Sequence, residues 1–128
     1  MRLVISIVVS VLPLFLVFAC APVEVSPEEA TFANVTAIIE EFCLECHSGD
    51  KPGGELSMES YETLLKGGEE GSAIEPGDAE NSLLIMLVER REKPYMPMKP
   101  KGGGRAKRVP SRDIAILRMW IDAGAQKS

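Results

Sequence analysis

Apolar residues recur every three to four positions in four stretches of the chain, which is the spacing that places them on one face of an amphipathic helix. Segments rich in glycine, proline and polar residues separate the four stretches. No stretch shows the strict alternation of a strand. The pattern predicts an all-α fold, a small helical domain of about four helices. The apolar faces are formed by Val35, Ile38, Ile39 and Phe42; Leu56, Met58, Tyr61, Leu64 and Leu65; Leu83, Leu84, Leu87 and Val88; and Ile114, Leu117, Trp120 and Ile121.

Polar residues in front of each stretch predict where the helices begin, since short oxygen-bearing side chains cap helix N-termini. Glycines at residues 67–68 and at residue 124 predict where the second and last helices end. The expected caps are Ser26, with Pro27 as the first helical residue, then Ser57 or Ser60, then Asp78, and finally Ser111 before a helix from residue 112 to residue 123.

Two long segments between the helices are predicted to be loops. Residues 48–54 are dense in turn-forming residues, and residues 93–110 contain four prolines, three glycines and six basic residues. Long ordered loops in small domains usually carry function. The second loop contains Met96 and Met98, which gives it two thioether sulfurs.

The N-terminus has the pattern of an export signal, with Arg2 followed by almost unbroken apolar sequence from residue 3 to residue 18. An uncleaved membrane anchor is the alternative. Residues 17–20 resemble a bacterial lipobox, which predicts a signal peptide at 1–19 and lipidation of Cys20. Residues 20–26 then form a tether and residues 27–128 the domain. A leftover thiol beside an ordinary cleavage site is the competing interpretation of Cys20.

The charge balance limits the classes of partner. The chain of 128 residues carries a formal net charge of -5, which makes nucleic acid an unlikely partner. Its length predicts one small domain after removal of the signal. Only 5% of its residues are aromatic, so a bound cofactor with a large apolar surface would add to a modest core.

The strongest chemical signal is the Cys-x-x-Cys-His pattern formed by Cys43, Cys46 and His47. Two thiols and an imidazole at this spacing are typical of covalent attachment of one haem, with the histidine as ligand to its iron. A redox-active cysteine pair and a zinc site are the alternatives, but the first lacks a βαβ pattern and the second lacks four ligands. His47 is the only histidine, so the second axial ligand is a methionine, water or absent.

The mature chain resembles class I c-type cytochromes, and more closely the planctomycete-type cytochrome c domain. This resemblance implies a helical fold in which the first and last helices cross beside one haem c, and Met96 as the distal ligand. It is carried by residues 43–47, 54–56, 61–68, 76–78, 82–84, 96–97 and 120–125.

Ligation by His47 and Met96 would leave the iron six-coordinate, so the expected function is outer-sphere electron transfer between protein redox partners and not an enzymatic reaction. The protein is expected outside the cytoplasm, on the periplasmic or cell-surface side, anchored to the membrane through lipid on Cys20. A haem peroxidase or gas-binding protein with a dissociable methionine is the first rival. A lipoprotein with a structural metal or a disulfide at Cys43 and Cys46 is the second.

Two expectations concern the long loop. Met96 is followed directly by proline, as in the family it resembles, so Met96 is predicted to be the ligand in preference to Met98. The basic residues around them predict either a docking surface for an acidic partner or a solvated loop. They are Lys93, Lys99, Lys101, Arg105, Lys107 and Arg108.

Overall fold

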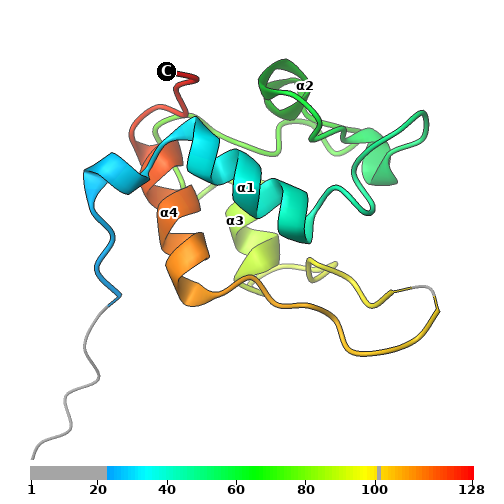
Figure 1. Ribbon diagram of the computed structural model, residues 1–128. Coiled ribbons are helices and arrows are strands. Elements are labelled where there is room, and N and C mark those ends of the chain that lie inside the picture. Colours follow the sequence, from blue (N-terminus) through cyan, green and yellow to red (C-terminus); the bar gives the residue numbers. More distant parts are fainter. Residues whose placement is uncertain (1–22, 101) are drawn as a thin grey trace, which may run out of the picture.

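The computed structural model describes residues 23–100 and 102–128, and its regular elements are helices (Figure 1). One isolated bridge joins Gly68 to Gly71, and the described residues contain no named strand. The all-α prediction is confirmed. The predicted signal peptide and Cys20 lie outside the described residues. The elements in chain order are η1 (Pro27–Glu29), α1 (Phe32–Phe42), η2 (Gly53–Glu55), α2 (Tyr61–Lys66), α3 (Leu83–Val88) and α4 (Ser111–Asp122).

The first helix begins later than the sequence predicted. Ser26 and Pro27 do start a helical turn, in which the Ser26 backbone N–H donates to the Glu29 carboxylate at 3.0 Å, but this is the short 3-10 helix η1. The chain then becomes extended at Thr31, whose side chain accepts from the Asn34 N–H at 3.3 Å and caps α1. The second capping residue breaks the expected single helix into two.

The third and fourth helices also differ from the prediction at their starts. Asp78 caps a turn by accepting from the Asn81 N–H at 3.1 Å, whereas the N-cap of α3 is Ser82. Ser111 lies inside α4, and the N-cap position is occupied by Pro110. The predicted cap of α2 is correct for Ser60, whose side chain accepts from the Thr63 N–H at 3.1 Å. The apolar residues before Ser60 lie in the preceding loop and not in α2.

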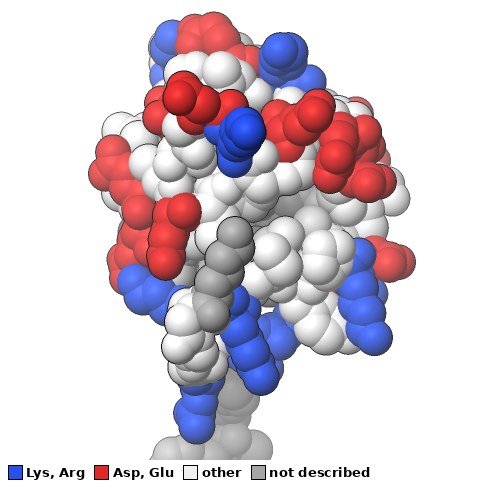
Figure 2. All heavy atoms as spheres, turned by 90° about the vertical axis from the view of Figure 1, so that its right-hand side faces the viewer, with Lys and Arg blue, Asp and Glu red and all other residues white. Residues whose placement is uncertain are grey.

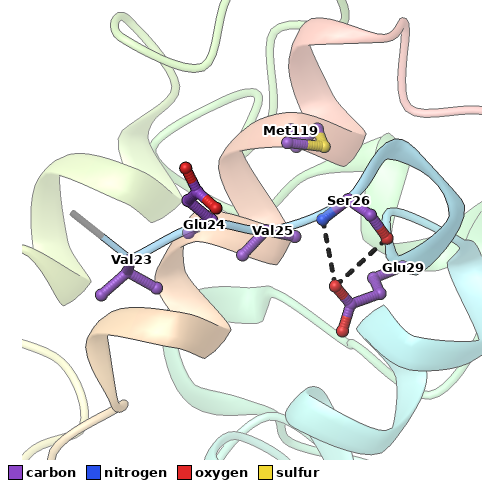
Figure 3. A pocket seen from close by; sticks show the side chains of 7 residues that line it. Val23, Glu24, Val25, Ser26, Glu29 and Met119 are labelled. Carbon is purple, nitrogen blue, oxygen red and sulfur yellow. Dashed lines mark hydrogen bonds between the residues drawn. The ribbon is translucent and has the colours of Figure 1, made fainter. Parts of the chain in front are cut away.

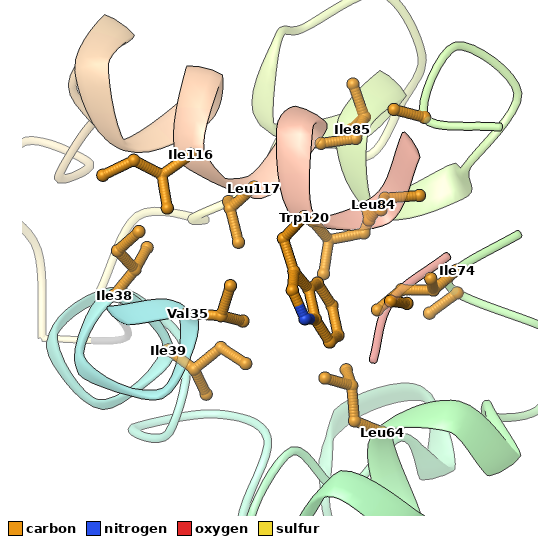
Figure 4. Packing of buried hydrophobic residues seen from close by; sticks show 14 of the residues in the cluster. Val35, Ile38, Ile39, Leu64, Ile74, Leu84, Ile85, Ile116, Leu117 and Trp120 are labelled. Carbon is orange, nitrogen blue, oxygen red and sulfur yellow. The ribbon is translucent and has the colours of Figure 1, made fainter. Parts of the chain in front are cut away.

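The core lies where α1, α3 and α4 meet (Figures 1 and 4). Trp120 of α4 lies at the centre with 2% of its surface exposed, between Val35 of α1 and Leu64 of α2. Its indole N–H donates to the Gln126 carbonyl oxygen at 2.7 Å, so the ring is buried without an unpaired donor. The contacts between α1 and α4 agree with the expected crossing of the first and last helices.

Charged residues tie α3 to α4 on the surface. The Arg118 guanidinium donates to the Glu89 carboxylate at 2.9 Å and to the Glu80 carboxylate at 2.6 Å. The bond to Arg118 holds the pKa of Glu80 below its usual range, and Arg91 adds to the effect. This end of α3 leads directly into the long loop that contains Met96. Within the described ranges, no helix is both long enough and apolar enough to cross a membrane.

Candidate functional site

The Cys-x-x-Cys-His residues form a tight turn at the end of α1. Cys43 is the C-cap residue of α1, and its carbonyl oxygen accepts from the backbone N–H groups of Cys46 at 3.1 Å and His47 at 3.0 Å. Cys43 is half-buried and Cys46 is exposed. The turn therefore brings together the three residues that the sequence singled out.

The two thiols are unpaired, and no further metal ligands are grouped with them in the part of the chain that the structure describes. Cys43 and Cys46 are free, so they form no disulfide. Burial raises the pKa of the Cys43 thiol to about 11, and the neighbouring Cys46 thiol adds to the rise, so Cys43 is a neutral thiol at pH 7. Among the described residues, no three His, Cys, Asp or Glu side chains are grouped so that they could hold a metal ion.

The imidazole of His47 is fixed by the loop that follows it. Its Nδ1 lies 3.1 Å from the carbonyl oxygen of Leu56. Because a carbonyl oxygen can only accept, Nδ1 carries a proton, and in the neutral imidazole this leaves the lone pair of Nε2 for a metal. The His47 carbonyl oxygen in turn accepts from the Met58 N–H at 2.8 Å, which holds both ends of the residue to one loop.

Two residues of this arrangement were not identified as site residues from the sequence. Leu56 contributes a backbone carbonyl, for which the side-chain pattern carries no signal. Gly53 donates its N–H to the Cys46 carbonyl oxygen at 2.7 Å, and a Cβ on Gly53 would lie 3.2 Å from that oxygen and 3.7 Å from His47 Cε1. The glycine pair at residues 53–54 was a signal of close backbone approach, but it also fits an ordinary turn.

The two methionines of the long loop differ in burial. Met96 is half-buried, and its N–H donates to the Leu87 carbonyl oxygen at 3.1 Å, which holds this part of the loop to the end of α3. Met98 is 52% exposed. No described hydrogen bond joins Met96 to the His47 turn, so the two stand on separate loops.

The end of the basic loop returns to the end of α1. Lys107 forms an ion pair with Glu41 at 2.9 Å, and its ammonium group lies 4.7 Å from the centre of the Phe42 ring. Both partners directly precede Cys43. The loop is thus tied at one end to α3, through Met96, and at the other to the helix that carries the cysteines.

The charges on this side of the molecule are unevenly distributed. Figure 2 shows acidic side chains, with a few basic ones among them, on the upper part of the face and mainly basic side chains on the lowest part, at the height of the long loop. Arg105, Lys107 and Arg108 of this loop are exposed. The exposed basic residues of the long loop therefore form a basic region on the same loop that contains Met96.

A surface groove of about 580 Å³ lies elsewhere (Figure 3). It runs between the extended segment before η1 and helix α4, on the side of the molecule away from the cysteine turn (Figure 1). None of the four predicted site residues lines it. Its lining residues are Val23, Glu24, Val25, Ser26, Glu29, Ala115 and Met119.

A small all-α domain with a Cys-x-x-Cys-His turn and a histidine whose Nε2 is available for iron defines the class of c-type cytochromes. The comparison with protein families agrees, because the model of Planctomycete cytochrome C matches residues 43–101. The match supports a planctomycete-type cytochrome c domain that includes residues 43–101. No curated protein and no solved structure matches the chain.

Similarity to this family implies a covalently bound haem c with its iron. The residues of this chain fit such a group, since two free thiols three positions apart stand on one turn with an imidazole whose Nδ1 is bound to a carbonyl oxygen. Cys43 and Cys46 would hold the haem through thioether bonds, and His47 would ligate the iron. When bound, haem c supplies one-electron chemistry between its ferric and ferrous states.

Proposed function

We propose that this protein is an exported, lipid-anchored monohaem cytochrome c that carries electrons between protein redox partners, with haem attached at Cys43 and Cys46 and iron ligated by His47 and Met96. The cytochrome c domain itself makes haem-based electron transfer the general function. The observation that carries the proposal is the hydrogen bond between His47 Nδ1 and the Leu56 carbonyl oxygen, because it prepares Nε2 for the iron.

Met96 is the second ligand in this proposal. Its partial burial and its backbone bond to Leu87 support this role, whereas Met98 is 52% exposed. His47 is the only histidine of the chain, so a thioether is the strongest remaining ligand for haem iron. Met58 is also buried, but its backbone N–H bonds to the His47 carbonyl oxygen, so this proposal assigns it to the histidine side of the site.

Two axial protein ligands leave no open coordination position, so the residues of this chain restrict the iron to outer-sphere electron transfer. A thioether ligand raises the reduction potential relative to bis-histidine ligation. An apolar environment also raises the reduction potential, because it disfavours the extra positive charge of the ferric state. The surrounding acidic charges oppose both effects, but they are exposed and screened over about 8 Å at physiological salt.

The basic loop is the proposed docking surface for an acidic redox partner. Its charges gather on the lower part of the face shown in Figure 2, on the same loop as Met96, and would attract an acidic surface towards the haem edge. Charge reversal at Lys99 and Lys101 should slow electron transfer with the native partner at low salt. An unchanged rate would favour the interpretation of a solvated loop.

The anchor and the location rest on the sequence around Cys20, together with the general export of cytochrome c domains. In this proposal Cys20 carries lipid and residues 20–26 tether the domain to a membrane. Cys20→Ala should release a soluble protein with unchanged haem content. A native protein that is already soluble and carries an unmodified Cys20 would contradict the anchor and leave the electron-transfer function intact.

Carbon monoxide distinguishes the electron carrier from the rival class, a peroxidase or gas-binding protein whose methionine dissociates. The ferrous protein should keep its spectrum under carbon monoxide at neutral pH, because both axial positions are occupied. Rapid formation of a carbon monoxide complex would favour the rival. A redox titration of the same spectrum then gives the potential, which limits the possible donors and acceptors.

A further inference from the structure

We infer that Gly68 is a positioning residue for His47, because the glycine turn at residues 67–71 packs against the backbone segment that holds the imidazole. The inference rests on the proposed function, in which His47 ligates the haem iron. It assigns to this turn an influence on the reduction potential, in addition to ending α2.

The turn is closed by backbone bonds between its two ends. The Gly68 N–H donates to the Gly71 carbonyl oxygen at 2.9 Å, and the Gly71 N–H donates to the Gly68 carbonyl oxygen at 3.0 Å. Gly67 enters the turn with φ at 79°, in the left-handed region, and a side chain there would overlap the Gly71 carbonyl. The turn is thus a compact backbone unit with no room for side chains on its inner side.

This unit lies directly against residues 54–56. The Glu69 N–H donates to the Gly54 carbonyl oxygen at 2.8 Å. A Cβ on Gly68 would overlap that same oxygen and would lie 2.9 Å from Leu56 Cβ and 3.0 Å from the Leu56 nitrogen. The Leu56 carbonyl oxygen then accepts from His47 Nδ1 at 3.1 Å. Leu56 therefore contacts both Gly68 and the imidazole.

The bond to Leu56 affects the iron because it raises the basicity of the imidazole. A more basic Nε2 stabilises the ferric state and lowers the reduction potential. Any displacement of Leu56 that lengthens the bond should therefore raise the potential. General loosening of the fold has the opposite sign, because water around the haem favours the more highly charged ferric state. The sign of the shift separates a positioning role from a merely structural one.

The test is Gly68→Ala in the full-length holoprotein, with Gly102→Ala as the matched control. Neither glycine has φ in the left-handed region, but a Cβ at residue 102 meets nothing within 4 Å. Gly68→Ala should keep covalent haem and shift the reduction potential upwards, whereas Gly102→Ala should leave the potential at the wild-type value. A folded Gly68→Ala protein with an unchanged or lowered potential would overturn the inference.

A second variant keeps the inference testable where Gly68→Ala does not fold. Gly71 has φ at 94° and open space around its Cβ, so Gly71→Ala strains the turn without touching Leu56. Hydrogen exchange of the His47 Nδ1–H, followed by NMR in the ferrous protein, should be faster in this variant than in the wild type. An exchange rate equal to that of the wild type would overturn the inference.

The wild-type protein separates this inference from the proposed function. A wild-type protein without covalent haem, or with a ferric spectrum that His47→Ala leaves unchanged, would contradict the proposed function. A wild-type protein that passes both controls, combined with glycine variants that change neither the potential nor the exchange rate, would contradict only the role of Gly68.

Discussion

The helical half of the molecule, formed by α1, α3 and α4, buries its large side chains, whereas the loop half, formed by residues 43–57, 89–100 and 102–108, leaves its chemically active side chains partly exposed. Val35, Ile85 and Ile121 have no exposed surface, while Cys46 is exposed and Met98 is 52% exposed. The helical half is held by apolar packing. The loop half is held largely by backbone hydrogen bonds and surface charges, so we expect it to depend more on its cofactor.

The largest expected effect comes from removing both attachment residues. Cys43→Ala combined with Cys46→Ala should abolish covalent haem, as measured by the pyridine haemochrome spectrum. Backbone amides of residues 43–57 and 89–108 should then lose more hydrogen-exchange protection than those of α1 and α4, because the loop half has little core of its own. Equal loss of protection in the two halves would show that they depend equally on the cofactor.

Trp120→Ala should be the most damaging single substitution in the helical half. The side chain is 2% exposed and stands at the centre of the core, so its truncation should lower the free energy of unfolding by about 3–5 kcal/mol. Denaturant unfolding measures this loss. Tyr95→Ala, at a ring that is 40% exposed in the loop half, is the control and should cost about 1 kcal/mol or less. Comparable losses of unfolding free energy in Trp120→Ala and Tyr95→Ala would contradict the division into a packed helical half and a loop half.

Ser60→Ala should have a smaller effect on the segment that joins the halves. It removes the cap of α2 and should cost about 1 kcal/mol in unfolding free energy. Ser111→Ala is the matched control, because Ser111 lies inside α4 and no side chain caps that helix. The control should be nearly neutral. A larger loss at Ser111 than at Ser60 would mean that the caps have been wrongly assigned.

Lys107→Ala should have the smallest effect. Its ion pair with Glu41 joins two side chains that are 60% and 57% exposed, so it should contribute less than about 1 kcal/mol, decreasing with added salt. Lys99→Ala removes the same charge from the same loop without an ion pair among the described residues, and should not change stability. A salt-independent loss at Lys107 would assign the stabilisation to packing on Phe42 instead.

The same division separates what the sequence could predict from what it could not. Helical periodicity identified Val35, Leu117 and Trp120 as core residues, because apolar residues at helical spacing share one face of a helix and that face is buried. The starts of α1 and α3 were predicted wrongly, since Ser26 and Asp78 cap short turns and another polar residue nearby caps the helix.

The site was predictable where it depends on side-chain chemistry. Cys43, Cys46 and His47 form a recognisable pattern, and the structure places them on one turn. The Leu56 carbonyl was not predictable, because a backbone acceptor can belong to any residue type. The choice between Met96 and Met98 followed only from a resemblance, because periodicity carries no information in a loop rich in proline.

The most direct test of the account is the band of the ferric protein at the red end of the visible spectrum that arises from charge transfer between a methionine sulfur and iron. The wild type should show this band. Met96→Ala should abolish it and lower the reduction potential, while Met98→Ala should preserve both. Loss of the band in Met98→Ala alone would transfer the ligand role to Met98, and its absence from the wild type would contradict ligation of the iron by histidine and methionine.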